Sequence, residues 1–198
     1  MTIIKTFTYR IYPTKKQIHI MNRWLKECRW LYNCFLEKYI DTFETYGLVF
    51  KAQENAISDA KKERPTLTNV CDSVLQDVVK RVNQSFQDFV RRSDEAKEEK
   101  PEFPRLRGKN EYNSLTFPRS KFRFINSKKL HIAKIGNIKI NLHRPFEGNI
   151  KTCTIKRSYT DKWYVSFTCK CEPIPLPKID TRIIDMTYES PIDVIGAC

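Results

Sequence analysis

Residues 129–171 read KLHIAKIGNIKINLHRPFEGNIKTCTIKRSYTDKWYVSFTCKC, and this stretch decides the fold. Apolar side chains recur at every second position in two runs, at 138, 140 and 142 and at 163, 165, 167, 169 and 171. A period of two is typical of a strand that buries one face. Turn residues at 136–137, 145–149 and 159–162 separate the runs, as a meander or a small barrel requires. The stretch therefore predicts a basic, antiparallel β unit.

Residues 3–12 show the same alternation. Lys5, Phe7, Tyr9 and Ile11 fall on one side of this predicted strand, and Pro13 ends it because proline has no amide hydrogen for the ladder. A lone strand with an exposed edge is a liability. We therefore expect residues 3–12 to pair with the later strands, which makes the intervening segment an insertion into a β-barrel.

Helical periodicity begins directly after the first strand. Thr14 and Gln17 form a capping box, and apolar residues then recur at threes and fours toward Phe43. Gly47 is a stop signal. The pattern fits one long helix, or two helices with a bend near residues 26–29.

Two further helices are predicted before residue 94. A short helix at 51–62 ends before Pro65. A second capping box, Ser73 with Gln76, predicts the start of a helix that runs to about Arg92.

These elements predict an α+β fold. We expect residues 1–13 to form the first barrel strand and 14–93 a helical insertion. Residues 94–112 are a basic and charged linker, and 113–176 complete a small antiparallel β-barrel.

Positive charge is concentrated in one part of the chain. The net charge is +13, and residues 100–157 hold 15 Lys and Arg against three acidic residues, whereas the first 99 residues are nearly balanced. One-sided positive charge indicates a polyanionic partner, usually nucleic acid. A solvated basic face and an anionic membrane surface are the alternatives. Nucleic acid is favoured because the charges alternate with apolar strand residues and do not lie along an amphipathic helix.

Composition excludes several other classes of protein. A hydrophobic fraction of 40% with 12% aromatic residues is that of a globular chain. Residues 1–12 contain no apolar signal core and no run of 18 apolar residues occurs, so we expect a cytoplasmic protein without a membrane partner. The seven cysteines form no C-x-x-C pair, which favours free thiols over a zinc site. We expect no cofactor in this chain.

Several short motifs resemble one known family. They are YRIYPTKKQ at 9–17, CRWLYN at 28–33, PRLR at 104–107, FP at 117–118, LHRP at 142–145, IKT at 150–152 and KWYVSF at 162–167. In this order they resemble the TnpB/OrfB proteins of insertion sequences, which are transposon-associated RNA-guided nucleases, over residues 1 to about 178. The resemblance implies a wedge β-barrel interrupted by a helical recognition lobe with a helix-turn-helix-like start. It also implies guide RNA and DNA as partners.

In the resembled family a RuvC-like nuclease domain that uses Mg²⁺ follows the wedge barrel. Residues 177–198 match only a truncated or degenerate start of that domain, with Asp185 at the position of the first catalytic carboxylate. The glycines that flank this motif are replaced or missing, and Pro191 interrupts its strand. Two-metal cleavage needs several carboxylates that converge on the ions. We therefore expect no catalytic residue and no metal ligand in this chain, and Asp185 is only a vestigial match.

The candidate nucleic-acid-binding residues are cations, several of them beside aromatic or turn residues. Cations neutralise phosphates, and exposed rings stack on unpaired bases. For the rings of Phe117, Phe122 and Phe124 we favour burial in the core, and for the charges beside them contact with nucleic acid. At residues 143–144 a phosphate contact and a solvated turn are equal alternatives. The candidates are Lys15, Lys16, Arg29, Arg105, Arg107, Lys109, Arg119, Lys121, Arg123, Lys139, His143, Arg144, Lys156 and Arg157.

The sequence therefore predicts a nucleic-acid-binding fragment of a TnpB-like protein that holds guide RNA, DNA or both on a basic β-barrel and does not cleave them. One alternative is part of an active RNA-guided DNA endonuclease, completed by a downstream segment or by a RuvC-like domain in trans. The others are a non-functional remnant and a protein-interaction module.

Overall fold

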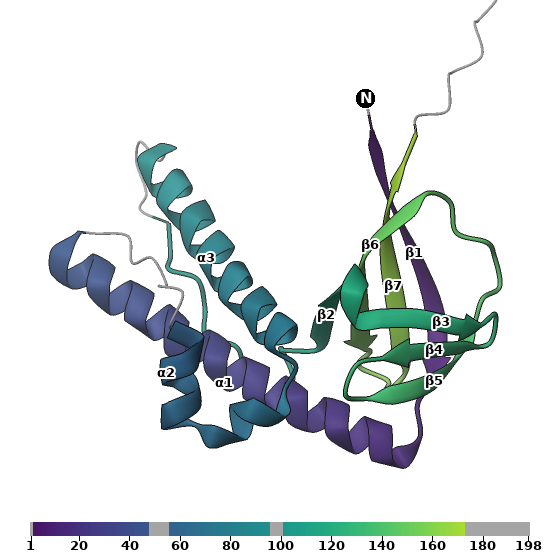
Figure 1. The fold of residues 1–198 in the computed structure, drawn as a ribbon. Coiled ribbons are helices and arrows are strands. Elements are labelled where there is room, and N and C mark those ends of the chain that lie inside the picture. The colour runs from purple at the N-terminus through teal and green to yellow at the C-terminus, as the bar shows by residue number, and fades with distance from the viewer. Residues whose placement is uncertain (1, 48–55, 96–100, 173–198) are drawn as a thin grey trace, which may run out of the picture.

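The computed structural model describes residues 2–47, 56–95 and 101–172 of the chain. A helical half lies beside a sheet half (Figure 1). In chain order the elements are β1 (Ile3–Tyr12), α1 (Lys15–Tyr46), α2 (Ala56–Glu63), η1 (Pro65–Asn69), α3 (Asp72–Glu95), β2 (Ser114–Pro118), η2 (Arg119–Lys121), β3 (Phe122–Asn126), β4 (Lys129–Ile132), β5 (Gly136–Asn141), β6 (Asn149–Arg157) and β7 (Trp163–Cys171). The predicted α+β class is confirmed. The segment 177–198, with Asp185, lies outside the described residues.

The strands form one antiparallel sheet in the order β2-β6-β7-β1-β5-β4-β3. It curls into a half-barrel with β2 and β3 at its two edges (Figure 1). The first strand lies in the middle, where it pairs with β7 from Ile3 to Ile11 and with β5 from Arg10 to Tyr12. The prediction that residues 3–12 join the later strands is confirmed, and the helices are inserted between β1 and the rest of the sheet.

Strand parity gives the sheet an apolar inner face and a polar outer face. On the inner face Tyr9 and Phe167 are fully buried, and Phe7 stands directly opposite Phe167. On the outer face Thr8 stands opposite Ser166, and their hydroxyl oxygens are 2.8 Å apart. Directly opposed residues of an antiparallel pair project to the same side. The two rows keep their character except near the start of β1, where Lys5 stands opposite Cys169 and Ile4 opposite Lys170.

The first helix is one continuous element of 32 residues. Both hydrogen bonds of the predicted Thr14–Gln17 capping box are present, and Gly47 ends the helix in the left-handed conformation with φ 63°. Residues 26–29 continue the helix, so the first of the two alternatives, one long helix, is confirmed. Cys28 and Leu31 are both fully buried on its core side. The two helices of a helix-turn-helix therefore do not both lie within residues 15–46.

The predicted second capping box is wrong. The helix α3 begins at Asp72, so Ser73 lies inside its first turn. The carbonyl of Cys71 accepts the amides of Val74 and Leu75 at 2.9 and 3.2 Å, which makes Cys71 the residue that precedes the helix. An acidic residue in the first turn favours this start, because Asp72 faces the positive end of the helix dipole.

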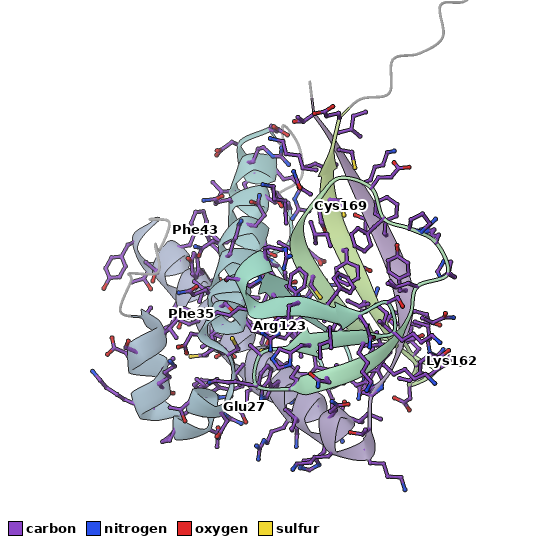
Figure 2. The ribbon with its side chains drawn as sticks, turned by 45° about the vertical axis from the view of Figure 1, so that its right-hand side comes forward. Glu27, Phe35, Phe43, Arg123, Lys162 and Cys169 are labelled. Atoms are coloured by element: carbon purple, nitrogen blue, oxygen red, sulfur yellow. The ribbon has the colours of Figure 1, made fainter. Side chains whose placement is uncertain are left out.

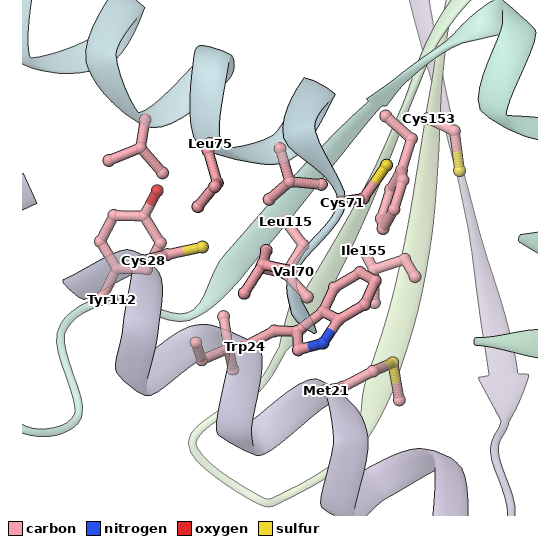
Figure 3. Close-up of a cluster of buried hydrophobic side chains, with 14 of the residues drawn as sticks. Met21, Trp24, Cys28, Val70, Cys71, Leu75, Tyr112, Leu115, Cys153 and Ile155 are labelled. Atoms are coloured by element: carbon pink, nitrogen blue, oxygen red, sulfur yellow. The ribbon is translucent and has the colours of Figure 1, made fainter. Parts of the chain in front are cut away.

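The helical half and the sheet share one hydrophobic core (Figure 3). Trp24 of α1 is 1% exposed, and its ring centroid lies 6.3 Å from that of Phe117 on β2. Leu115, Ile155 and Val70 surround the same region, each at most 1% exposed. The first part of α1 thus lies beneath the lower end of the sheet, and the later part packs against α3 (Figure 1).

None of the helices in the described part of the chain combines the length and the hydropathy that a membrane crossing requires.

Candidate nucleic-acid interface

The candidate basic residues lie on both halves of the molecule. Figure 2 shows Arg123 on the sheet, whereas Glu27, Phe35 and Phe43 mark the helical half. The sheet and its loops carry Arg119, Lys121, Arg123, Lys139, His143, Arg144, Lys156 and Arg157, and the remaining candidates lie on α1 and on the segment that precedes β2.

Two lysines on the β4–β5 hairpin face each other across the ladder. Lys129 is directly opposite Lys139, and Lys139 is in turn opposite Tyr12 of β1. Directly opposed side chains have Cβ atoms about 4.5–5.5 Å apart, and like charges in such a pair destabilise a sheet. Both lysines are exposed, and neither has an ion pair among the described residues. An anion bound between them would remove this repulsion.

The corner between β2 and β3 adds three more cations. Arg119 donates a hydrogen bond to the carbonyl of Phe122 at 2.9 Å, and its guanidinium lies 5.2 Å from the centre of that ring. Arg123 on β3 is exposed beside His131 of β4, and Lys121 is exposed in η2. Arg119 is thus partly used by the fold, whereas Lys121 and Arg123 project into solvent.

The rings of this corner are part of the core. Phe117 is fully buried and Phe122 is 4% exposed. Phe124 is half-buried and stacks on Phe146, with the ring centroids 5.4 Å apart. The expectation that these rings fill the core is confirmed for Phe117 and Phe122, and Phe124 packs against that core.

The loop between β5 and β6 folds back over β1. Tyr9 donates its hydroxyl hydrogen to the carbonyl of Arg144 at 3.1 Å, and the Arg144 guanidinium lies 5.5 Å from the centre of the Phe7 ring. His143 lies with its ring centroid 5.3 Å from that of Tyr9. Both residues are exposed, so the loop holds two polar side chains at a fixed place beside β1.

A second basic surface lies on the helical half. The side-chain oxygen of Asn33 accepts the amide of Arg107 at 2.8 Å, and its side-chain nitrogen donates to the carbonyl of Arg107 at 3.1 Å. This pair fixes the segment before β2 on α1 and places the Arg107 guanidinium 5.5 Å from the centre of the Tyr32 ring. Arg105 forms an ion pair with Glu102 at 2.8 Å, and Lys109 is exposed.

A groove runs along this segment between α1 and α3. Two hollows of about 430 and 340 Å³ share Tyr32, Ser85 and Arg107 as lining residues. The first also contains Arg81, and the second Arg92 and Arg105. The arginines come from α3 and from the segment before β2, whereas α1 contributes Tyr32, and Asp88 and Glu111 also line the groove.

The start of α1 is positively charged without compensation in its first turn. Lys15 and Lys16 are exposed there, and the first turn contains no acidic residue. The N-terminus of a helix carries the positive end of the dipole, so these charges add to it. Arg29 is half-buried farther along the helix.

The last two candidates on the sheet differ in role. Lys156 is exposed on the outer face of β6, opposite Tyr164 of β7. Arg157 is half-buried and donates a hydrogen bond to the side chain of Asn22 on α1 at 3.1 Å. Arg157 thus ties the sheet to α1, and Lys156 remains available.

The sequence patterns missed two arginines. Arg81 on α3 donates hydrogen bonds to Ser114 and Thr116 of β2 at 2.9 and 2.6 Å, contacts that only the folded chain brings together. Arg10 projects from the outer face of β1 among the hydroxyl side chains. The alternation of residues 3–12 already indicates that face, so strand parity was a usable signal for Arg10.

Metal ligands do not gather in the part of the chain that the structure describes. No group of three or more His, Cys, Asp or Glu side chains within these residues is placed to hold an ion. Asp185 belongs to the segment that is not described.

The comparisons with known proteins agree with the motifs near the N-terminus. Residues 1–47 match the family model HTH_OrfB_IS605, described as a helix-turn-helix domain. The matched residues form β1 and the single helix α1 up to its glycine cap. A search of curated proteins found no match.

Proposed function

We propose that this chain, whose residues 1–47 match the helix-turn-helix model of the IS605 OrfB family, binds DNA and a guide RNA through its basic half-barrel and the groove beside α1, without cleaving either. The family match supports a transposon-associated DNA-binding protein. Guide RNA binding and the lack of cleavage go beyond that match.

The observation that carries the proposal is the uncompensated charge of the sheet. Lys129 and Lys139 oppose each other directly, and Lys121, Arg123 and Lys156 lie exposed without an ion pair among the described residues. A fold gains nothing by placing two lysines in register. A row of phosphates provides the missing negative charge, which is the usual reason for such a face in a nucleic-acid-binding protein.

Contacts of this kind fix the position of the nucleic acid but do not read its sequence. Lysine and arginine hold phosphates by charge and hydrogen bonds, and base edges are read in the grooves. Where a guide RNA is present, base pairing supplies the sequence specificity and the protein holds the backbone. A basic sheet that holds phosphates suits that division of labour.

Because α1 is one continuous helix, DNA binding by the helical half cannot use a helix-turn-helix within residues 15–46. In a helix-turn-helix the second helix enters the major groove while the first crosses the backbone. Here the matched residues form β1 and one continuous helix, α1, whose partner on the helical side is α3. We propose that the helical half contributes through the arginine-lined groove and the exposed Lys15 and Lys16, which requires no recognition helix within residues 15–46.

Replacement of the opposed lysines tests the binding surface. The double variant Lys129→Gln/Lys139→Gln removes two phosphate contacts, so the slope of log affinity against log salt concentration falls by about 2 for duplex DNA. Thermal stability stays equal or rises, because the repulsion between the two ammonium groups is also removed. Fluorescence anisotropy with labelled duplex DNA measures the first effect, and a thermal melt the second.

The matched control is Lys62→Gln. This lysine is exposed on α2 and pairs with Asp59 at 2.9 Å, so its loss changes the net charge but not the sheet surface. Equal binding by the double variant and by the wild-type chain would show that the sheet is not part of the interface.

Incubation with Mg²⁺ tests the absence of cleavage. Two-metal hydrolysis requires several carboxylates around the ions, and we assign only binding to residues 2–172. The expected result is intact DNA and RNA after incubation of the purified chain with either substrate. If the wild-type chain gives cleavage products and the Asp185→Ala variant does not, this part of the proposal is overturned.

A further inference from the structure

Arg10 stands between two tyrosine rings on the outer face of the sheet. Its guanidinium carbon lies 5.2 Å from the centre of the Tyr164 ring and 5.5 Å from that of Tyr12. Its Nη1 donates a hydrogen bond to the Tyr164 hydroxyl at 3.3 Å, and its Nε is buried without a hydrogen-bond partner. The three side chains come from β1 and from the neighbouring strand β7, and they lie together on one face of the sheet.

A hollow adjoins this group on the side of β6. It has a volume of about 360 Å³ and is lined by Thr8, Lys156, Tyr159, Tyr164 and Ser166 together with the segments at 113 and 157–158. Tyr159 belongs to the turn between β6 and β7. A second hollow of about 330 Å³ continues past Tyr159 along the same turn.

These tyrosines are not needed by the core. Tyr159 is 91% exposed and Tyr12 is 49% exposed, whereas Phe117 and Phe167 on the inner face are fully buried. A guanidinium over an aromatic ring is held there by cation–π attraction and presents its own π-face. Tyr12 and Tyr164, which flank Arg10, and the exposed ring of Tyr159 are suited to stack on bases, because every base has a π-face.

Two lysines lie beside these tyrosines, where the sugar-phosphate backbone of a stacked strand would pass. Lys139 is directly opposite Tyr12, and Lys156 is directly opposite Tyr164. A directly opposed pair places the side chains about 4.5–5.5 Å apart at their Cβ atoms, so a phosphate next to a stacked base falls within reach of each ammonium group. The hydroxyls of Thr8 and Ser166 line the same hollow.

We propose that Arg10, Tyr12, Tyr159 and Tyr164, the tyrosine platform, bind an unpaired stretch of nucleic acid by stacking on its bases, with its phosphates at Lys139 and Lys156. This rests on the proposed nucleic-acid binding and specifies its ligand at this face as single-stranded. The bases of a duplex are already stacked on each other, so the platform has no ring to contact there. RNA and DNA share this stacking chemistry, and the experiment separates them.

The test uses the full chain and fluorescein-labelled 12-nucleotide strands of one sequence, as RNA, as DNA and as the corresponding DNA duplex. Variants are Tyr12→Ala, Tyr159→Ala and their double, with Tyr12→Phe as the conservative change. Tyr46→Ala is the matched control, because Tyr46 is 72% exposed at the end of α1 far from the sheet. Circular dichroism checks that each variant is folded.

We expect Tyr12→Ala and Tyr159→Ala each to lower single-strand affinity about five- to hundredfold, the range measured for loss of one base–aromatic stack. The salt slope and duplex affinity stay unchanged, and Tyr12→Phe and Tyr46→Ala bind like the wild-type chain. A larger effect on the RNA strand than on the DNA strand assigns the platform to RNA, and the reverse assigns it to DNA. With 5-iodouridine in the strand, light-induced crosslinks fall on Tyr12 or Tyr159.

Two outcomes overturn the inference and are distinct from each other. If the wild-type chain binds strands and duplex but the alanine variants bind strands equally well, the platform is wrong and the proposed function stands. If the wild-type chain binds none of the three ligands, both fail.

Discussion

Replacing Arg64 by methionine removes the cation that holds a buried carboxylate on α1. Glu27 is 6% exposed and accepts hydrogen bonds from Arg64 Nε at 2.5 Å, from Arg64 Nη2 at 3.2 Å and from Thr66 Oγ1 at 2.9 Å. In the variant Thr66 is the partner that remains. Loss of one member of a fully buried ion pair costs about 3–5 kcal/mol. Because the Arg64 side chain is 36% exposed, we expect the free energy of unfolding to fall by about 2–3 kcal/mol.

Urea denaturation at pH 7, followed by tryptophan fluorescence, measures this loss. Thr66→Val removes one hydrogen bond and is expected to cost about 1 kcal/mol. Lys62→Met on α2 serves as the control, because its exposed ion pair with Asp59 contributes at most about 1 kcal/mol. A change below about 0.5 kcal/mol for Arg64→Met would refute the reasoning, since such values are typical of neutral surface positions.

The same carboxylate gives a signed pH dependence. Burial raises the pKa of Glu27, but the hydrogen bonds from Arg64 and Thr66 outweigh it, so the pKa in the folded chain lies below the ordinary value of 4.5. A lowered folded pKa contributes stability above the unfolded value, and this stability is lost as the pH falls through the folded pKa. The wild-type chain therefore exceeds Glu27→Gln in unfolding free energy by the largest amount near pH 7, and this excess becomes smaller below pH 4.5. A difference that grows toward low pH would contradict the sign.

Three further substitutions or modifications test other contacts. Gly148 has φ +77°, and a β-carbon there would collide with the backbone of β7, so Gly148→Ala lowers the unfolding free energy by about 1–3 kcal/mol in urea denaturation. Gly47→Ala, at φ +63° but with no atom within 4 Å, costs about 1 kcal/mol and is its control. Arg81→Met removes the link from α3 to β2 and lowers the unfolding free energy by about 1–3 kcal/mol; an unchanged midpoint would show that the link is dispensable. Burial raises the pKa of Cys28 to about 12. At pH 8 iodoacetamide therefore modifies half-buried Cys34 well before Cys28, and mass spectrometry of the peptides measures the order of modification.

The elements with strong local patterns were predictable from the sequence. The alternation at residues 3–12 and 163–171 identified two strands that are in fact neighbours, because one buried face leaves a period of two in the chain. The Thr14–Gln17 capping box and Gly47 fixed both ends of α1, since each acts through residues a few positions away.

The features that the sequence left open depend on distant residues. Ser73 and Gln76 satisfy the local pattern of a capping box, yet the carbonyl of Cys71 takes the first helical hydrogen bonds and moves the start of α3. The bond between Glu27 and Arg64 joins positions 37 residues apart, and no periodicity reports such a pair. Arg10 lies on a recognisable face two residues before Tyr12, but its second tyrosine neighbour, Tyr164, is found only when β1 and β7 are aligned.

The salt dependence of binding tests the central proposal most directly. Association constants of the wild-type chain for labelled duplex DNA and for a structured RNA would be measured by anisotropy between 50 and 200 mM salt. If the basic surfaces neutralise roughly 6–10 phosphates, affinity falls by about 10³–10⁵ over this range. An affinity that does not change with salt, or no binding at 50 mM salt, would contradict nucleic-acid binding by the half-barrel.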